Sequence, residues 1–300
     1  MKTFLALVRR EVWEHTAIWL VPAVLSAVLV IVAGFASVKL LGGGVNIVMD
    51  GHGVETDQIF HGLSNLNLGM VVVFGLVMGV VATFYLLDCL LADRKDRSIL
   101  FWKSLPISDL TTVLSKLATA AVLIPLVTVI AGFITAFMLM LVVSVDLLVL
   151  GGSPWDMLWS QVPYFSNLAL VLYAMLVSVL WYLPLMGYLM LVSAFAKRAV
   201  MVWTVLPPLV IALIETQFMG SNHFAIMLSE RMGGFAPLAF NTDSLESMAD
   251  AIDQGHVGPG LDVISAAPFL QSPGLWLGLV VAGVFIAGAV YLRRYRDESI

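Results

Sequence analysis

Six long apolar runs constrain the fold of this 300-residue chain more than any other feature. A helix needs about 20 residues to cross the hydrocarbon core of a bilayer, and each run is about that long or longer. Inside that core every backbone N–H and C=O group must be hydrogen-bonded within the protein, which favours helices. We therefore predict an all-α integral membrane protein with about six transmembrane helices, at residues 17–41, 69–91, 117–145, 165–195, 199–218 and 273–292.

The amino-acid composition supports the same class. Hydrophobic residues make up 60% of the chain and charged residues 12%, whereas soluble domains carry about 25% charged residues. The single cysteine, Cys89, excludes an intrachain disulfide and a metal site built from several thiols. We expect Cys89 to act as a small buried hydrophobic side chain at the end of a span.

The distribution of lysine and arginine predicts the orientation of the spans. Only Lys39 and Arg231 fall on one side of the six-span arrangement, and every other basic residue falls on the opposite side. Loops rich in Lys and Arg remain in the cytoplasm. We therefore expect both termini to be cytoplasmic and the protein to be a multi-pass component of the cell inner (cytoplasmic) membrane. The basic residues on that side are Lys2, Arg9, Arg10, Arg94, Lys95, Arg97, Lys103, Lys116, Lys197, Arg198, Arg293, Arg294 and Arg296.

Two segments outside the spans are expected to form amphipathic helices. Residues 1–16 place apolar side chains at helical spacing and predict a helix lying on the membrane surface. Residues 219–272 form the large external loop, in which Thr242–Gln254 has a candidate N-cap and an apolar face. The apolar positions of the first segment are Phe4, Leu5, Val8 and Val12.

Residues 92–116 form a charged island between the second and third spans, ADRKDRSILFWKSLPISDLTTVLSK. Apolar and aromatic residues lie among its basic residues, which predicts a short element along the membrane interface. Pro106 ends that element, and Ser108 is placed to cap a new helix that starts with Asp109.

The chain contains no recognisable catalytic sequence. It lacks G-x-x-x-x-G-K-[ST], H-E-x-x-H and G-x-S-x-G, so we expect no ATP hydrolysis and no other catalysis by this chain alone. An external cluster has metal-ligand residue types but matches no defined spacing, so a solvated loop is the simpler interpretation. Its members are Asp50, His52, Glu55, Asp57 and His61.

The fifth span contains the residues most suited to a pathway or a hinge. Pro207 and Pro208 interrupt the backbone hydrogen bonding of an apolar helix and predict a kink there, although a static packing kink is an equal alternative. Glu215 is the one carboxylate placed within a span, near its outer end. Ionisable residues in membranes are costly, which indicates either substrate or proton handling or a structural hydrogen-bonding role at the interface or between subunits.

The charged island resembles the cytoplasmic loop of ABC-2 type transporter permeases. The similarity rests on Asp93-Arg94-Lys95-Asp96-Arg97-Ser98, on Ser104-Leu105-Pro106-Ile107-Ser108 and on Ser115-Lys116. The N-terminal Arg10-Glu11-Val12-Trp13-Glu14 also looks like the leading interfacial helix of that family. Elsewhere the resemblance rests on the number of spans and the long last external loop.

The resemblance implies a non-catalytic transmembrane subunit of an ATP-driven exporter. A coupling helix between spans two and three would dock on a separate ATPase subunit, which would hold ATP and Mg²⁺. A second permease copy or a paralogue would complete the pathway, and no nucleic-acid partner is implied. The implied cargo is hydrophobic or amphipathic. The implied docking residues are Asp93, Arg94, Lys95, Asp96, Arg97, Ile99, Leu100, Phe101, Trp102, Lys103, Leu105 and Pro106.

Three other functions remain open from the sequence. A permease-like sensor or immunity protein would keep the docking loop and lose a continuous polar pathway. A secondary transporter would need several buried charges or discontinuous helices in repeated halves. An intramembrane enzyme would need a catalytic constellation, and we find none in the sequence.

Overall fold

The computed structural model describes residues 2–42, 66–95, 107–241 and 261–295. Helices make up nearly all of these residues, and their only β-pairing is an isolated bridge between Phe240 and Ile264. Six helical stretches are long and apolar enough to cross a membrane, which confirms the predicted class and number of spans.

The first three spans are formed by α2 (Ala17–Gly42), α4 (Leu66–Lys95) and a long continuous stretch that starts at α6 (Asp109–Ala118). That stretch runs through the π-helical turn η1 (Thr119–Leu123) into α7 (Ile124–Val149). Proline has no N–H and its ring crowds the carbonyl four residues earlier, so the wider turn directly before Pro125 accommodates that residue without breaking the helix.

The last three spans are α9 (Tyr164–Phe195), α10 (Val200–Ile214) and α15 (Pro273–Tyr295). Ala199 separates α9 from α10 in a left-handed backbone conformation with φ of 52°. At the far end of α10 the π-helical turn η3 (Glu215–Met219) leads to α11 (His223–Gly233).

Short helices precede the first span or connect the later ones. They are α1 (Lys2–Glu14), α8 (Pro154–Met157), η2 (Trp159–Gln161), α12 (Ala236–Ala239), η4 (Leu261–Val263) and α14 (Ala266–Gln271). The predicted interfacial segment, residues 1–16, is thus helical over nearly its whole length. The predicted helix at Thr242–Gln254 and the cluster from Asp50 to His61 lie outside the described residues.

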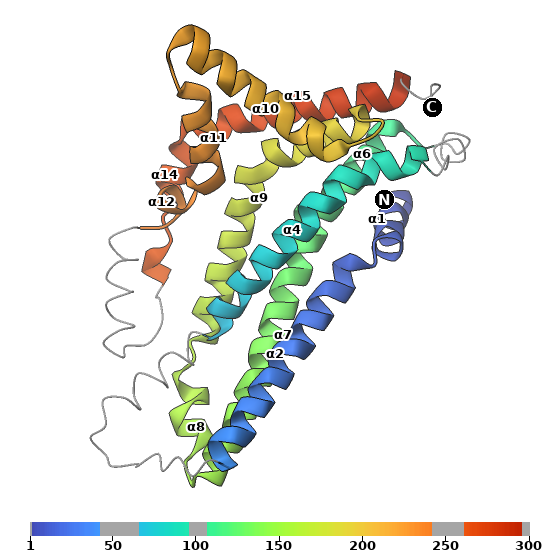
Figure 1. Ribbon diagram of the computed structural model, residues 1–300. Helices are drawn as coiled ribbons and strands as arrows, with labels where there is room; N and C mark the ends of the chain where they lie inside the picture. Colours follow the sequence, from blue (N-terminus) through green and yellow to red (C-terminus); the bar gives the residue numbers. More distant parts are fainter. Residues whose placement is uncertain (1, 43–65, 96–106, 242–260, 296–300) are drawn as a thin grey trace.

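The spans pack in pairs: α9 lies along α15, α4 lies between α7 and α9, and α2 packs on α7 (Figure 1). Two glycines permit the closest approaches. A methyl group at Gly132 of α7 would lie 3.2 Å from the backbone of Val71 in α4, and one at Gly187 of α9 would lie 3.2 Å from the Ala282 carbonyl oxygen in α15. Small residues at helix crossings are typical of membrane bundles, where close packing replaces the hydrophobic effect.

The start of α1, the start of α6 and the end of α15 lie at one end of the bundle (Figure 1). We call this the basic end, because Arg10, Arg94, Lys116, Arg198 and Arg293 are near it. The outer surface of the spans is apolar; in α2, for example, Val28, Ile31 and Phe35 are 50%, 56% and 69% exposed. Such a surface suits contact with lipid.

Candidate functional site

Four helices meet at the basic end, and each contributes a buried ionisable side chain. Glu11 of α1, Asp93 of α4, Lys116 of α6 and Arg293 of α15 are 2%, 3%, 1% and 5% exposed. Burying a charge costs free energy unless an opposite charge or hydrogen bonds compensate for it. The four side chains therefore have to be understood together.

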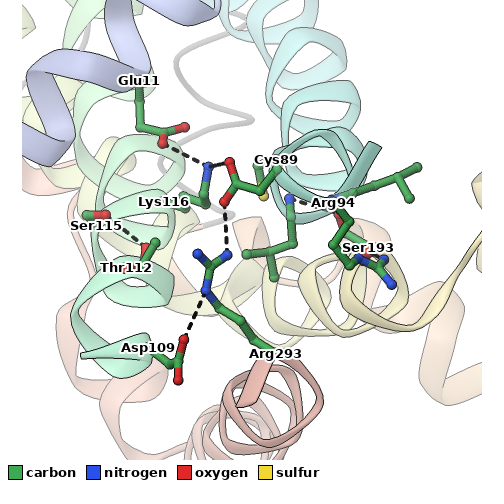
Figure 2. A network of polar contacts seen from close by, with 12 residues as sticks. Glu11, Cys89, Arg94, Asp109, Thr112, Ser115, Lys116, Ser193 and Arg293 are labelled. Atoms are coloured by element: carbon green, nitrogen blue, oxygen red, sulfur yellow. Dashed lines mark hydrogen bonds and ion pairs between the residues drawn. The ribbon is translucent and has the colours of Figure 1, made fainter. Parts of the chain in front are cut away.

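Lys116 lies between two carboxylates. Its Nζ donates a hydrogen bond to Oε1 of Glu11 at 2.8 Å and lies 3.5 Å from Oδ1 of Asp93. Figure 2 shows the Lys116 ammonium directed to the Glu11 carboxylate across the gap between α6 and α1. The hydroxyl of Tyr85 donates to the second Glu11 oxygen at 2.9 Å, so both oxygens of this buried carboxylate have a partner.

Asp93 is the second centre of the cluster. Arg293 Nη1 donates to its Oδ2 at 2.9 Å, and Arg10 Nη2 lies 3.7 Å from its Oδ1. Arg293 Nε lies 3.3 Å from Oδ1 of Asp109 in the first turn of α6 (Figure 2). Three carboxylates thus meet three cations, and we call these six residues the basic-end network: Arg10, Glu11, Asp93, Asp109, Lys116 and Arg293.

Local sequence signals place the α6 part of this network. Ser108 is the N-cap of α6, and its Oγ accepts a hydrogen bond from the Thr111 backbone N–H at 3.1 Å, as the sequence predicts. Asp109 is then in the first helical turn, where the helix dipole favours an acidic residue. Arg293 is in the last turn of α15, where the dipole favours a basic one.

Arg94 ties the end of α4 to the end of α9. Its Nη2 donates to the carbonyl oxygens of Ser193 and Ala196, at 2.5 and 2.8 Å. These carbonyls lie at the C-terminal end of α9, where the helix dipole attracts a cation. The side-chain oxygen of Ser193 also accepts from the backbone N–H groups of Leu90 and Leu91, each at 3.2 Å.

The structure describes only part of the predicted docking segment. Asp93 and Arg94 form internal contacts that hold helix ends together, and their role in docking a partner stays a prediction. Lys95 is exposed at the end of α4. The remaining predicted docking residues lie outside the described residues: Asp96, Arg97, Ile99, Leu100, Phe101, Trp102, Lys103, Leu105 and Pro106.

The candidate pathway residues of the fifth span differ in their contacts: the two prolines lie within a helix, and the carboxylate is hydrogen-bonded. Pro207 and Pro208 lie inside α10, which continues through both. The Glu215 carboxylate accepts hydrogen bonds from Ser221 Oγ and from the backbone N–H groups of His223 and Phe224, each at 2.8 Å. Glu215 therefore caps the start of α11. This contact favours the structural hydrogen-bonding role over substrate or proton handling.

Sequence reasoning missed Glu11 and Arg293 as members of a site. Leu5, on the expected apolar face of α1, is 63% exposed, as a membrane-facing side chain would be, whereas Leu7 and Glu11 face the protein interior. The available signal was a set of acidic and basic residues at span ends on one side. That signal could not say which acid pairs with which base, because 105 residues separate Glu11 from Lys116 and 200 separate Asp93 from Arg293.

The chemistry of the basic-end network is that of a joint between helices. Each charge has an opposite charge within reach, and no three His, Cys, Asp or Glu side chains of the described segments come together in a way that could hold a metal ion. Comparison of the sequence with protein-family models, with curated proteins and with solved structures gave no match.

Proposed function

We propose that this chain is the membrane-spanning permease subunit of an ATP-driven ABC-2 type transporter. In this proposal a separate ATPase subunit docks on residues 96–106 and supplies ATP hydrolysis, and a second permease copy or paralogue completes the pathway. The cargo would be hydrophobic or amphipathic and would leave the cell. Both termini and the basic end would face the cytoplasm, as the positive-inside rule favours.

One observation carries this proposal: the two helices that flank residues 96–106 are joined to each other and to two further helices. Asp93, two residues before the end of α4, and Lys116, in the last turn of α6, meet in the basic-end network. Glu11 extends the connection to α1, and Arg293 extends it to α15.

Such an arrangement suits the transmission of force. Packed elements joined by short charge-assisted hydrogen bonds move as a rigid body, and rigid-body movement is how transport proteins change which side they open to. A soluble partner that pulls on residues 96–106 would therefore move four helices together. The absence of a phosphate-binding sequence in this chain is compatible with a motor on another subunit.

The test is co-purification from the native membrane. We expect a soluble chain with G-x-x-x-x-G-K-[ST] to accompany the tagged protein and to be lost from the Phe101→Ala/Trp102→Ala double variant. The matched control replaces two exposed aromatic residues near α8, as Trp155→Ala/Phe165→Ala, and should retain the partner. An ATPase that never co-purifies, under conditions that preserve other complexes, would overturn the proposal.

Loss of coupling can be separated from loss of binding by measuring ATP hydrolysis and transport in the reconstituted complex. A partner that binds and hydrolyses ATP while no cargo moves would indicate a sensor or immunity protein. Transport in proteoliposomes that contain this chain and no ATPase would indicate a secondary transporter. Glu215→Gln serves here as a pathway test, because a carboxylate that contacts cargo would change the transport rate when its charge is removed.

A further inference from the structure

A cavity of about 510 Å³ opens beside the basic-end network, between the start of α2, the second half of α4 and the start of α10. Apolar side chains form most of its wall. One wall is a single face of α4, the opposite wall is Val200 and Met201, and Ala17 and Ile18 close a third side. Because α4 ends at the basic end, the cavity runs from that end toward the middle of the span. The α4 residues that line it are Val80, Val81, Phe84, Tyr85, Leu87, Asp88, Leu91 and Lys95.

Two charged side chains line this cavity without a described partner. Asp88 and Lys95 are exposed, and neither forms an ion pair or a side-chain hydrogen bond within the segments that the structure describes. They lie seven residues apart on one face of α4, which corresponds to about 10 Å along the helix axis. Lys95 is therefore at the mouth, and Asp88 lies deeper, next to the apolar wall.

The other polar side chains among the described lining residues, Tyr85 and His15, are already engaged. Tyr85 donates to Glu11 and to the carbonyl of Lys116. His15 packs edge-on against the Tyr85 ring, with centroids 4.7 Å apart, and its Nε2 lies 3.7 Å from the Glu11 carboxylate. Among the described residues that line the cavity, Asp88 is thus the one carboxylate that remains available to a ligand.

We propose that this cavity binds an amphiphile with a positively charged amino group. The ammonium pairs with Asp88, and the hydrocarbon chain lies against Val80, Val81, Phe84 and Ile18. Asp88 lies where the apolar lining of the cavity begins. Its carboxylate attracts the cationic head group of an amphiphile whose hydrocarbon chain contacts that lining, and it repels an anionic head group at the same depth. Lys95 at the mouth disfavours a second positive charge and leaves room for an anionic or neutral group beyond the amine.

This inference goes beyond the transport proposal, because ligand binding requires no ATPase. If the protein is a permease, the ligand indicates the chemical class of its cargo. If the protein is not a permease, the cavity is still expected to bind the ligand. The amine could belong to a membrane lipid or to a free amphiphile, and both present the same chemistry to Asp88. The experiment below distinguishes these two sources.

Binding is measured on the full-length protein in nanodiscs of uncharged lipid, with empty nanodiscs subtracted. The probes share one chain length: dodecyltrimethylammonium, dodecanol and dodecanoate. We expect the ammonium probe to bind at least about tenfold more tightly than the other two, which corresponds to one well-placed charge pair. Equal binding of the alcohol, or tighter binding of dodecanoate, would overturn the proposal.

Two variants test the charges in opposite directions. Asp88→Asn should weaken the ammonium probe about tenfold, and Lys95→Gln should strengthen it about two- to threefold because it removes a like charge from the mouth. Glu230→Gln on α11, an exposed carboxylate far from the cavity, is the control and should change nothing. Because Asp88 and Lys95 are exposed, both variants should fold; an Asp88→Asn protein with unchanged affinity refutes the assignment.

Mass spectrometry of the purified protein separates the two sources of the amine. An amino-headed lipid retained by the native protein and depleted from Asp88→Asn identifies a resident lipid. Binding of the ammonium probe to protein that retains no such lipid identifies a free amphiphile.

Discussion

The two ends of α15 are held to their neighbours by different chemistry. At its last turn Arg293 joins a network of six ionisable side chains, and four of these are at most 5% exposed. Near its first turns, the Arg231 guanidinium of α11 lies 4.3 Å from the centre of the Trp181 ring of α9 and donates to the Gly274 carbonyl of α15 at 3.2 Å. The Arg231 backbone carbonyl also accepts a hydrogen bond from Trp181 Nε1 at 2.8 Å.

The contrast shows two ways to stabilise a membrane helix bundle with charge. In the basic-end network each ion depends on another ion, so removing one leaves others buried without compensation. The Arg231 contact uses an aromatic face and a backbone carbonyl, which stay neutral when the arginine is lost. Partial burial lowers the pKa of Arg231 below its usual value. We expect the network to be sensitive to single changes and the Arg231 contact to be tolerant.

The largest effect should come from Lys116→Met. This change keeps an unbranched side chain that is one atom shorter, and it removes the cation that lies between Glu11 and Asp93. Breaking a buried charge pair from one side costs about 3–5 kcal/mol of the free energy of unfolding. Denaturant unfolding of the purified protein in detergent measures this loss.

A second variant identifies its cause. Adding Glu11→Gln to Lys116→Met removes the stranded negative charge and should recover part of the lost stability. A double variant that is as unstable as the sum of the two single variants would show that Lys116 and Glu11 do not act as a pair.

Asp93→Asn should cost less than Lys116→Met, although Asp93 contacts more cations. Each of those cations has a second carboxylate: Lys116 has Glu11, Arg293 has Asp109 and Arg10 has Glu14. The loss then approximates that of hydrogen bonds to a charged group, about 1.5–3 kcal/mol. The same unfolding assay checks the order of the two stability losses. An Asp93→Asn protein that is less stable than the Lys116→Met protein would show that the network depends more on Asp93 than on Lys116.

The sequence predicts the elements of this network better than it predicts their connection. The six spans and the Ser108 cap are confirmed, because apolar length and capping are local properties. The third span was predicted to start at residue 117 and in fact forms one helix from Asp109. Hydropathy treats Asp109 and Lys116 as residues that belong in water, whereas the structure neutralises them with partners from α15 and α1.

The same limit applies to Arg94 and to Arg231. Their charges were visible in the sequence, but their partners are carbonyl groups and an aromatic ring, which no charge pattern reveals. Pairing of residues far apart in the chain is decided by which helices pack together. A single sequence contains little information about that choice.

The Arg231 contact should show a smaller effect, and Gly278→Ala tests it without changing any charge. A methyl group at Gly278 would overlap the Arg231 guanidinium, which has to move off Trp181 and Gly274. We expect a loss of about 1 kcal/mol, the usual value of a cation–π contact at a partly exposed site.

Gly283→Ala is the matched control for this change. Gly283 lies on the same helix, and no atom would meet the added methyl group within 4 Å. Alanine is a better helix former than glycine, so this control should unfold at the same free energy as the native protein or slightly higher. Equal stability losses for the two glycine variants would mean that the contacts of the Arg231 guanidinium do not stabilise the bundle.

The smallest effect should come from Glu215→Gln, measured by the same denaturant unfolding in detergent. Glu215 accepts from the backbone N–H groups of His223 and Phe224, each through a different oxygen. Glutamine keeps one acceptor oxygen and turns an NH₂ group toward the other donor, so one bond is lost and α11 keeps a partial cap. The expected stability loss is smaller than that of Gly278→Ala. A loss as large as that of Lys116→Met would instead place Glu215 with the basic-end network, as a charge on which the whole bundle depends.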